Sequence, residues 1–90
     1  MIARTLIWNL FDSKTTLEEL RDALDEELAD DPPGRRFAAW ISDESSERFG
    51  EFSVWDSPED SELAGPGRLR DLVGRDPEVW EQFDLEGWTG

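Results

Sequence analysis

Hydrophobic residues follow a two-residue alternation in some segments of the chain and a helical spacing in others. Residues 1–11 carry apolar side chains on both alternating faces, which is typical of a central strand covered on two sides. Residues 37–41 and 49–55 are predicted as two strands of an antiparallel hairpin around the polar turn 42–48. Residues 79–85 alternate apolar and polar positions, which predicts a fourth strand.

Two other segments show helical spacing. Thr16 and Glu19 match the capping box that begins many helices, and a proline pair ends the pattern, which predicts one helix over residues 17–29. Ser57 before a proline predicts a second start, with helical pieces at 59–64 and 68–73 separated by Gly-Pro-Gly and closed by a glycine cap at Gly74. The residues predicted to face inward from these helices are Leu17, Leu20, Leu24, Leu28, Leu69, Leu72 and Val73.

The resulting order is strand, helix, strand, strand, helix, strand. Over 90 residues it predicts one α+β domain, a ferredoxin-like βαββαβ sandwich with a four-stranded antiparallel sheet and both helices on one face. The other face would expose several apolar and aromatic side chains, which a monomer seldom leaves to water. We therefore expect two copies to lay these faces together as a dimeric α+β barrel.

Composition and charge exclude several classes of function. The chain has no cysteine, histidine or tyrosine, which excludes thiolate and Ser-His-Asp catalysis and histidine-ligated metals. It carries 23 acidic against nine basic residues, a formal charge of −14, so nucleic acid and anionic membranes are not expected partners. No apolar run is long enough to span a membrane, and the N-terminal segment lacks a signal-peptide layout, so we expect a cytoplasmic protein.

Acidic residues gather on and after the first predicted helix. They lack the spacing of a calcium-binding loop, so a solvated acidic surface is the simpler interpretation, and we predict no metal site. The residues concerned are Asp22, Asp25, Glu26, Asp30 and Asp31.

Three of the five tryptophans fall on predicted strands. Trp8, Trp40 and Trp55 could line a pocket for a flat organic ligand, or they could fill the sheet face and the dimer seam. Arg4 could bind an anionic group of a ligand, pair with one of the many carboxylates, or lie at a rim with its guanidinium in water. Asn9 could stabilise an oxyanion or be an ordinary polar residue at a strand end. Arg4 and Asn9 lie on opposite faces of the first strand, so the sequence does not decide which face lines the barrel. We favour the face that carries Arg4 and Trp8.

Residues 37–45 (FAAWISDES) and 50–60 (GEFSVWDSPED) resemble the middle hairpin and helix start of dimeric α+β barrel proteins. Within that superfamily the chain is most similar to the YdhR-like and antibiotic biosynthesis monooxygenases. The likeness continues loosely through residues 68–72 (RLRDL) to residues 83–85 (FDL), and it includes no invariant catalytic signature.

The resemblance implies a homodimer with an internal cavity and a monooxygenase that acts on a small aromatic or quinone-like compound without a cofactor. Pockets of such relatives use Asn, Trp, Tyr, Arg or His, of which this chain offers Arg4, Trp8, Asn9, Trp40 and Trp55. The absence of histidine argues against haem chemistry. The alternatives are a non-enzymatic dimer that binds a small molecule or partner protein in the same cleft, and a structural subunit with a filled barrel.

Overall fold

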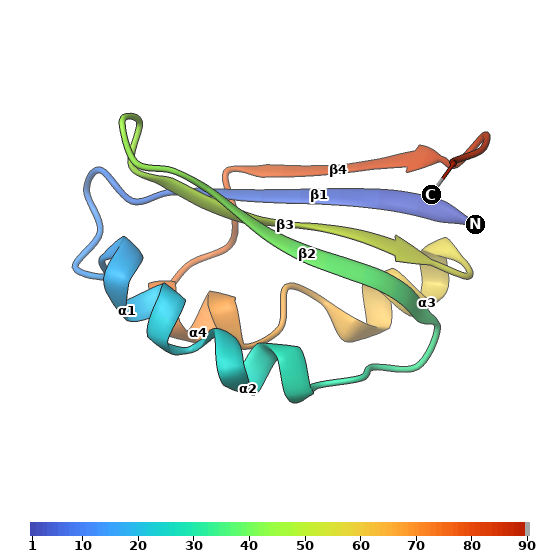
Figure 1. Cartoon of the computed structure of the whole chain (residues 1–90), viewed down its shortest axis with the longest axis horizontal. Helices are drawn as coiled ribbons and strands as arrows, with labels where there is room; N and C mark the ends of the chain where they lie inside the picture. Colours follow the sequence, from blue (N-terminus) through green and yellow to red (C-terminus); the bar gives the residue numbers. More distant parts are fainter. Residues whose placement is uncertain (90) are drawn as a thin grey trace.

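A computed structural model describes residues 1–89 of the chain. Its centre is one four-stranded sheet in which every neighbouring pair is antiparallel and the strand order is β2-β3-β1-β4. The strands are β1 (Ile2–Asn9), β2 (Arg35–Asp43), β3 (Arg48–Trp55) and β4 (Val79–Asp84) (Figure 1). The predicted element order is confirmed, and the architecture is compatible with a ferredoxin-like fold.

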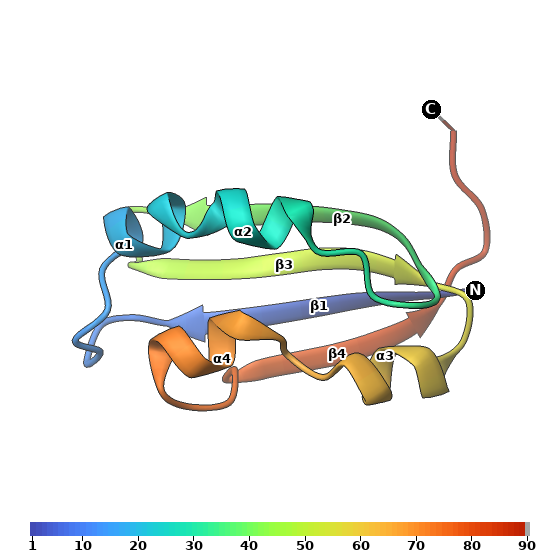
Figure 2. The same ribbon diagram turned by 90° about the horizontal axis from the view of Figure 1, so that it is seen from below.

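Four short helices cover one face of the sheet and leave the other face open (Figure 1). Seen from the helical side, one pair lies along β2 and β3 and the other along β1 and β4 (Figure 2). The helices are α1 (Leu17–Asp22), α2 (Leu24–Ala29), α3 (Pro58–Ala64) and α4 (Arg68–Val73). None of them, within residues 1–89, has the length and apolar character of a membrane span.

The predicted helix starts and stops coincide with observed caps. The Thr16 side chain accepts a hydrogen bond from the backbone N–H of Glu19 at 3.2 Å, and Ser57 accepts one from Asp60 at 3.3 Å. Gly74 ends α4 in the left-handed conformation, with φ of 87°. These local bonds satisfy groups that a helix end leaves open, which explains why short polar motifs located the ends correctly.

Three details of the prediction are wrong. The single helix over residues 17–29 is broken at Ala23, which caps α1 and precedes α2. Leu24 still packs against the core, but Leu28 does not and is 65% exposed. In α4 the buried stripe runs through Leu69 and Val73, so Leu72 turns outward. The first strand ends at Asn9, because the chain then forms a turn, in which the Ser13 N–H donates to the Leu10 carbonyl oxygen at 3.0 Å, and continues to α1.

The hydrophobic core lies between the sheet and the helices. Its side chains come from alternate positions of β1 and from the covered sides of β2 and β3, together with the inward faces of α1, α2 and α4. Its fully buried members are Leu6, Trp8, Leu10, Leu20, Phe49 and Leu69, against which Leu17, Leu24, Trp40 and Val73 pack.

Candidate functional site

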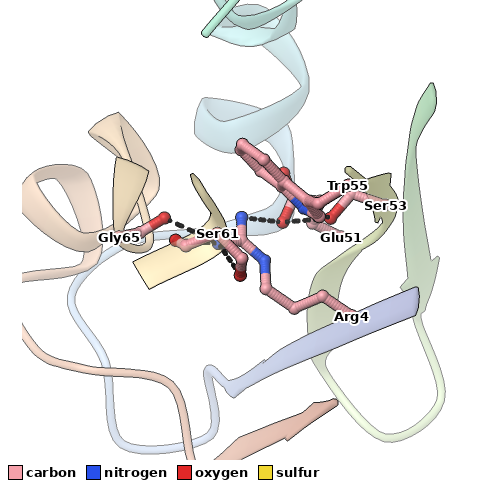
Figure 3. A network of polar contacts seen from close by, with 6 residues as sticks. All are labelled: Arg4, Glu51, Ser53, Trp55, Ser61 and Gly65. Atoms are coloured by element: carbon pink, nitrogen blue, oxygen red, sulfur yellow. Dashed lines mark hydrogen bonds and ion pairs between the residues drawn. The ribbon is translucent and has the colours of Figure 1, made fainter. Parts of the chain in front are cut away.

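Arg4 lies beneath the sheet, on the side that the helices cover, and is 2% exposed. Its Nη2 donates to Oε2 of Glu51 on the neighbouring strand at 2.6 Å. Its Nη1 donates to the carbonyl oxygens of Ser61 and Gly65 at 3.1 and 3.0 Å, and contacts the Ser61 hydroxyl at 3.2 Å (Figure 3). The guanidinium therefore ties the sheet to α3 and its C-terminal cap.

A second set of contacts fixes the carboxylate and the guanidinium from the sides. The indole N–H of Trp55 donates to the Ser53 hydroxyl at 2.7 Å, and that hydroxyl donates to Oε2 of Glu51 at 3.3 Å (Figure 3). The Arg4 guanidinium carbon lies 4.7 Å from the Trp55 ring centroid, within cation–π range. Of the interpretations open for Arg4, the carboxylate pair is the one observed.

A small polar cavity of about 70 Å³ adjoins this pair, between the end of α2 and the α3–α4 connection. It has room for a few water molecules and is too small for an aromatic ring, since a benzene-binding cavity needs about 150 Å³. Glu27 reaches it from α2 and is 5% exposed, and its Oε1 has no hydrogen-bond partner among residues 1–89. Burial, reinforced by nearby Asp30, raises the pKa of Glu27.

The three strand tryptophans also lie on the covered side. Trp8 and Trp55 are fully buried, and the indole N–H of Trp8 donates to the carbonyl oxygen of Arg75 at 2.9 Å. Trp40 is half-buried against the core, and the guanidinium carbon of Arg35 lies 5.7 Å from its ring centroid. Trp55 meets Arg4, whereas Trp8 and Trp40 belong to the core cluster, so the five candidates do not form one pocket.

The preference for Arg4 and Trp8 as the lining face is corrected by this arrangement. The helices cover that side of the sheet, and the side that carries Asn9 is the one left open (Figure 1). Asn9 is exposed at the end of β1, where its Oδ1 accepts from the backbone N–H of Phe11 at 3.1 Å, a polar strand-end role. The sequence could not decide between the faces, because both sides of β1 are mostly apolar.

The open side of the sheet, which we call the outer face, is mostly apolar over its three central rows and is bounded at the hairpin end by the Asp43–Arg48 ion pair. Its side chains form three rows across β4, β1, β3 and β2, in which only Glu81 carries a charge. Four of its large apolar members, Phe37, Ile41, Phe52 and Phe83, are 37–55% exposed. The rows are Phe83–Ala3–Val54–Phe37, Glu81–Thr5–Phe52–Ala39 and Val79–Ile7–Gly50–Ile41.

The two ends of the outer face differ. At one end, after β4, the Trp88 ring meets the Phe37 ring edge-to-face with centroids 6.1 Å apart. At the other end, Gly50 lies between Ile7 and Ile41, and a hollow of about 140 Å³ opens there. Sequence reasoning missed this hollow. A glycine inside a strand was the available signal, because such a glycine often marks a close approach of backbone or ligand.

A comparison of the chain with protein-family models finds no match, and a comparison with curated proteins also finds none. The functional argument therefore rests on the geometry of the two sides of the sheet.

Proposed function

We propose that the protein works as a homodimer that holds a small aromatic or quinone-like molecule between the outer faces of its two copies. The observation that carries this proposal is the apolar outer face of a chain whose formal charge is −14. Two copies with this charge repel each other across most of their surface. Their approach costs least where both surfaces carry little net charge. The outer face is such a surface, because the Asp43–Arg48 pair at its edge is neutral overall and its three rows contain one further charge, Glu81.

The size of the outer face supports a second copy as the occupant. Strands about 4.8 Å apart and about eight residues long at 3.3 Å each give a face of roughly 20 by 26 Å. Two such faces bury on the order of 1,000 Å² in total, which is the lower limit for a specific protein interface. A dimer formed in this way would enclose the hollow at Gly50.

Sedimentation of the full chain tests the dimer. The wild-type chain of 10.3 kDa should sediment at about twice its mass at micromolar concentration. Ile41→Glu adds a charge to the outer face and should sediment as a folded monomer. Leu63→Glu is the matched control, because Leu63 is 88% exposed on α3, in the helix layer, and its variant should remain dimeric. A monomeric wild type, or a dimeric Ile41→Glu variant, would contradict the proposal.

Oxidation of the bound molecule is the second candidate function, and the carboxylate in the middle row of the outer face favours it. Glu81 pairs in register with Thr5 in the middle row, so a hydroxyaromatic that lies over this row between the two copies would have a group able to accept its proton nearby. The resulting anion is more electron-rich and reacts more readily with oxygen. This is the chemistry that the resemblance to cofactor-independent monooxygenases implies.

Oxygen uptake with a panel of dihydroxyaromatics tests this second candidate. Uptake should exceed that of buffer and should fall about a hundredfold or more in Glu81→Gln, the usual range for loss of a general base. Glu62→Gln, an equal change of charge on α3, should leave the rate unchanged. Uptake no faster than in buffer, or insensitive to Glu81→Gln, would leave binding without oxidation as the function.

A further inference from the structure

The hollow at the hairpin end of the outer face has the size and lining of a site for one aromatic ring. Its volume is about 140 Å³. An apolar cavity of about 150 Å³ lined by Leu, Ile and Phe binds benzene, so a single six-membered ring matches the volume of this hollow. Ile7 and Ile41 form its two walls, with Gly50 between them.

The backbone keeps the position between these walls free of a side chain. A Cβ atom at Gly50 would lie 2.1 Å from the carbonyl oxygen of Leu6 and 2.7 Å from Cδ1 of Ile7. Both distances are far below van der Waals contact, so β1 and β3 can approach as they do only with glycine here. The close approach of the two strands therefore requires glycine at this position, and the side chain of Ile7 lies beside it as one wall of the hollow.

One edge of the hollow is polar. Asp43 and Arg48 face each other across the β2–β3 pair, and Nη2 of Arg48 donates to Oδ2 of Asp43 at 2.8 Å. The Ser45 hydroxyl donates to the other carboxylate oxygen at 2.8 Å. The hydrogen bond from Arg48 holds the pKa of Asp43 well below its usual range, so the carboxylate is ionised. Nε and Nη1 of Arg48 make no hydrogen bond within residues 1–89, so this edge presents both a free N–H donor and an anionic acceptor.

We propose that the hollow over Gly50 binds a neutral, single-ring hydroxyaromatic compound, with its ring between Ile7 and Ile41 and its hydroxyl on the Asp43–Arg48 pair. The hydroxyl accepts from Arg48 and donates to Asp43, a combination that a ring without a hydroxyl lacks. A ring carboxylate would oppose both Asp43 and the net negative charge of the chain. This inference rests on the proposed function in one respect: a second copy is what would cover the open side of the hollow.

Amide chemical-shift titration of the ¹⁵N-labelled full chain tests the site, with hydroquinone, toluene and benzoate as probes. Hydroquinone should shift the amides of Ile7, Ile41 and Gly50. It should bind roughly tenfold more tightly than toluene, because its hydroxyl gains hydrogen bonds to charged groups, and benzoate should bind most weakly. Equal affinities for hydroquinone and toluene, or shifts located elsewhere, would overturn the proposal.

Two variants separate the walls from the polar edge. Ile41→Trp fills the hollow with an apolar ring and should abolish binding of hydroquinone and toluene while the protein remains dimeric. Phe37→Trp, at the other end of the outer face, is its control and should bind both as the wild type does. Arg48→Met should keep toluene binding and lose most of the preference for hydroquinone. Binding that survives Ile41→Trp contradicts the site.

The failure of this inference and the failure of the proposed function are distinguishable. A wild type that sediments as a monomer but shows hydroquinone shifts at Gly50 keeps the site and loses the dimer. A dimer without those shifts keeps the association and loses the site.

Discussion

The two sides of the sheet reverse the usual distribution of polar and apolar groups. The covered side holds a buried arginine and glutamate, whereas the open side displays phenylalanine and isoleucine. Charge is tolerated inside because Arg4 finds acceptors on β3, on α3 and at Gly65 within hydrogen-bond distance. In this fold, therefore, whether a charged side chain can be buried depends on the hydrogen-bond partners around it as much as on its polarity.

Two ion pairs of equal length show what burial changes. Arg4–Glu51 and Arg36–Asp56 both have a nitrogen–oxygen distance of 2.6 Å. The side chains of the first pair are 2% and 7% exposed, and those of the second are 60% and 39% exposed. The hydrogen bond to Asp56 raises the pKa of Arg36, but water can replace that partner, whereas little else can satisfy Glu51 if Arg4 is removed.

The largest effect is therefore expected from Arg4→Met. It leaves a buried carboxylate without its cation and removes the donor to two carbonyl oxygens, and should lower the free energy of unfolding by about 3–5 kcal/mol. Urea denaturation followed by circular dichroism measures this change. Since a domain of this size has limited stability, the variant and the wild type are compared in the same stabilising osmolyte.

Two further variants control this measurement. Arg36→Met removes an arginine from a pair of the same length on the surface and should leave the urea midpoint unchanged. Arg4→Met combined with Glu51→Leu removes both buried charges and should recover most of the loss, because apolar replacements fill such sites well. An Arg4→Met variant as stable as Arg36→Met would show that burial does not distinguish the two pairs.

The element order and most element ends could be predicted because their causes are local in the sequence. Thr16, Ser57 and Gly74 act on backbone groups within three or four residues of themselves. The alternation in β3 likewise separates Phe52 from Ser53 without knowledge of any other segment. Such signals depend on neighbouring residues alone, so a single sequence is sufficient to read them.

The site could not be predicted to the same extent, because its causes are distant in the sequence. Arg4 contacts residues 47, 57 and 61 positions away, and the sequence contains 23 acidic residues from which its partner might come. The orientation of β1 was ambiguous because both of its faces are mostly apolar. The hollow at Gly50 depends on how closely β1 approaches β3, which only the packed sheet reveals.

Glu27 differs from both ion pairs, because it is a buried carboxylate on the covered side whose Oε1 has no hydrogen-bond partner within residues 1–89. Burial comes first among the causes that raise its pKa, followed by the negative charge of Asp30, with a smaller contribution from Glu51. Arg68 and Arg35 act in the opposite direction and do not compensate. The folded chain therefore binds this proton more tightly than the unfolded chain does, so this group lowers stability once it is ionised.

The sign of the effect sets the expected pH dependence. The contribution of Glu27 is constant below its ordinary pKa, where both states are protonated, and it becomes less favourable as pH rises through the raised folded pKa. Glu27→Gln should consequently raise the free energy of unfolding by about 1 kcal/mol at neutral pH, and by much less near pH 4. Urea denaturation at the two pH values measures the difference.

The control for this variant is Glu62→Gln on α3, because removal of any negative charge relieves some repulsion in a chain of charge −14. Glu62 is exposed, so its variant reports that general relief alone. The gain of Glu27→Gln over Glu62→Gln at neutral pH then measures the cost of ionising a buried carboxylate. Equal increases in the free energy of unfolding for the two variants would mean that water solvates the Glu27 carboxylate to the same extent as that of Glu62. Ionisation of Glu27 would then carry no cost from burial.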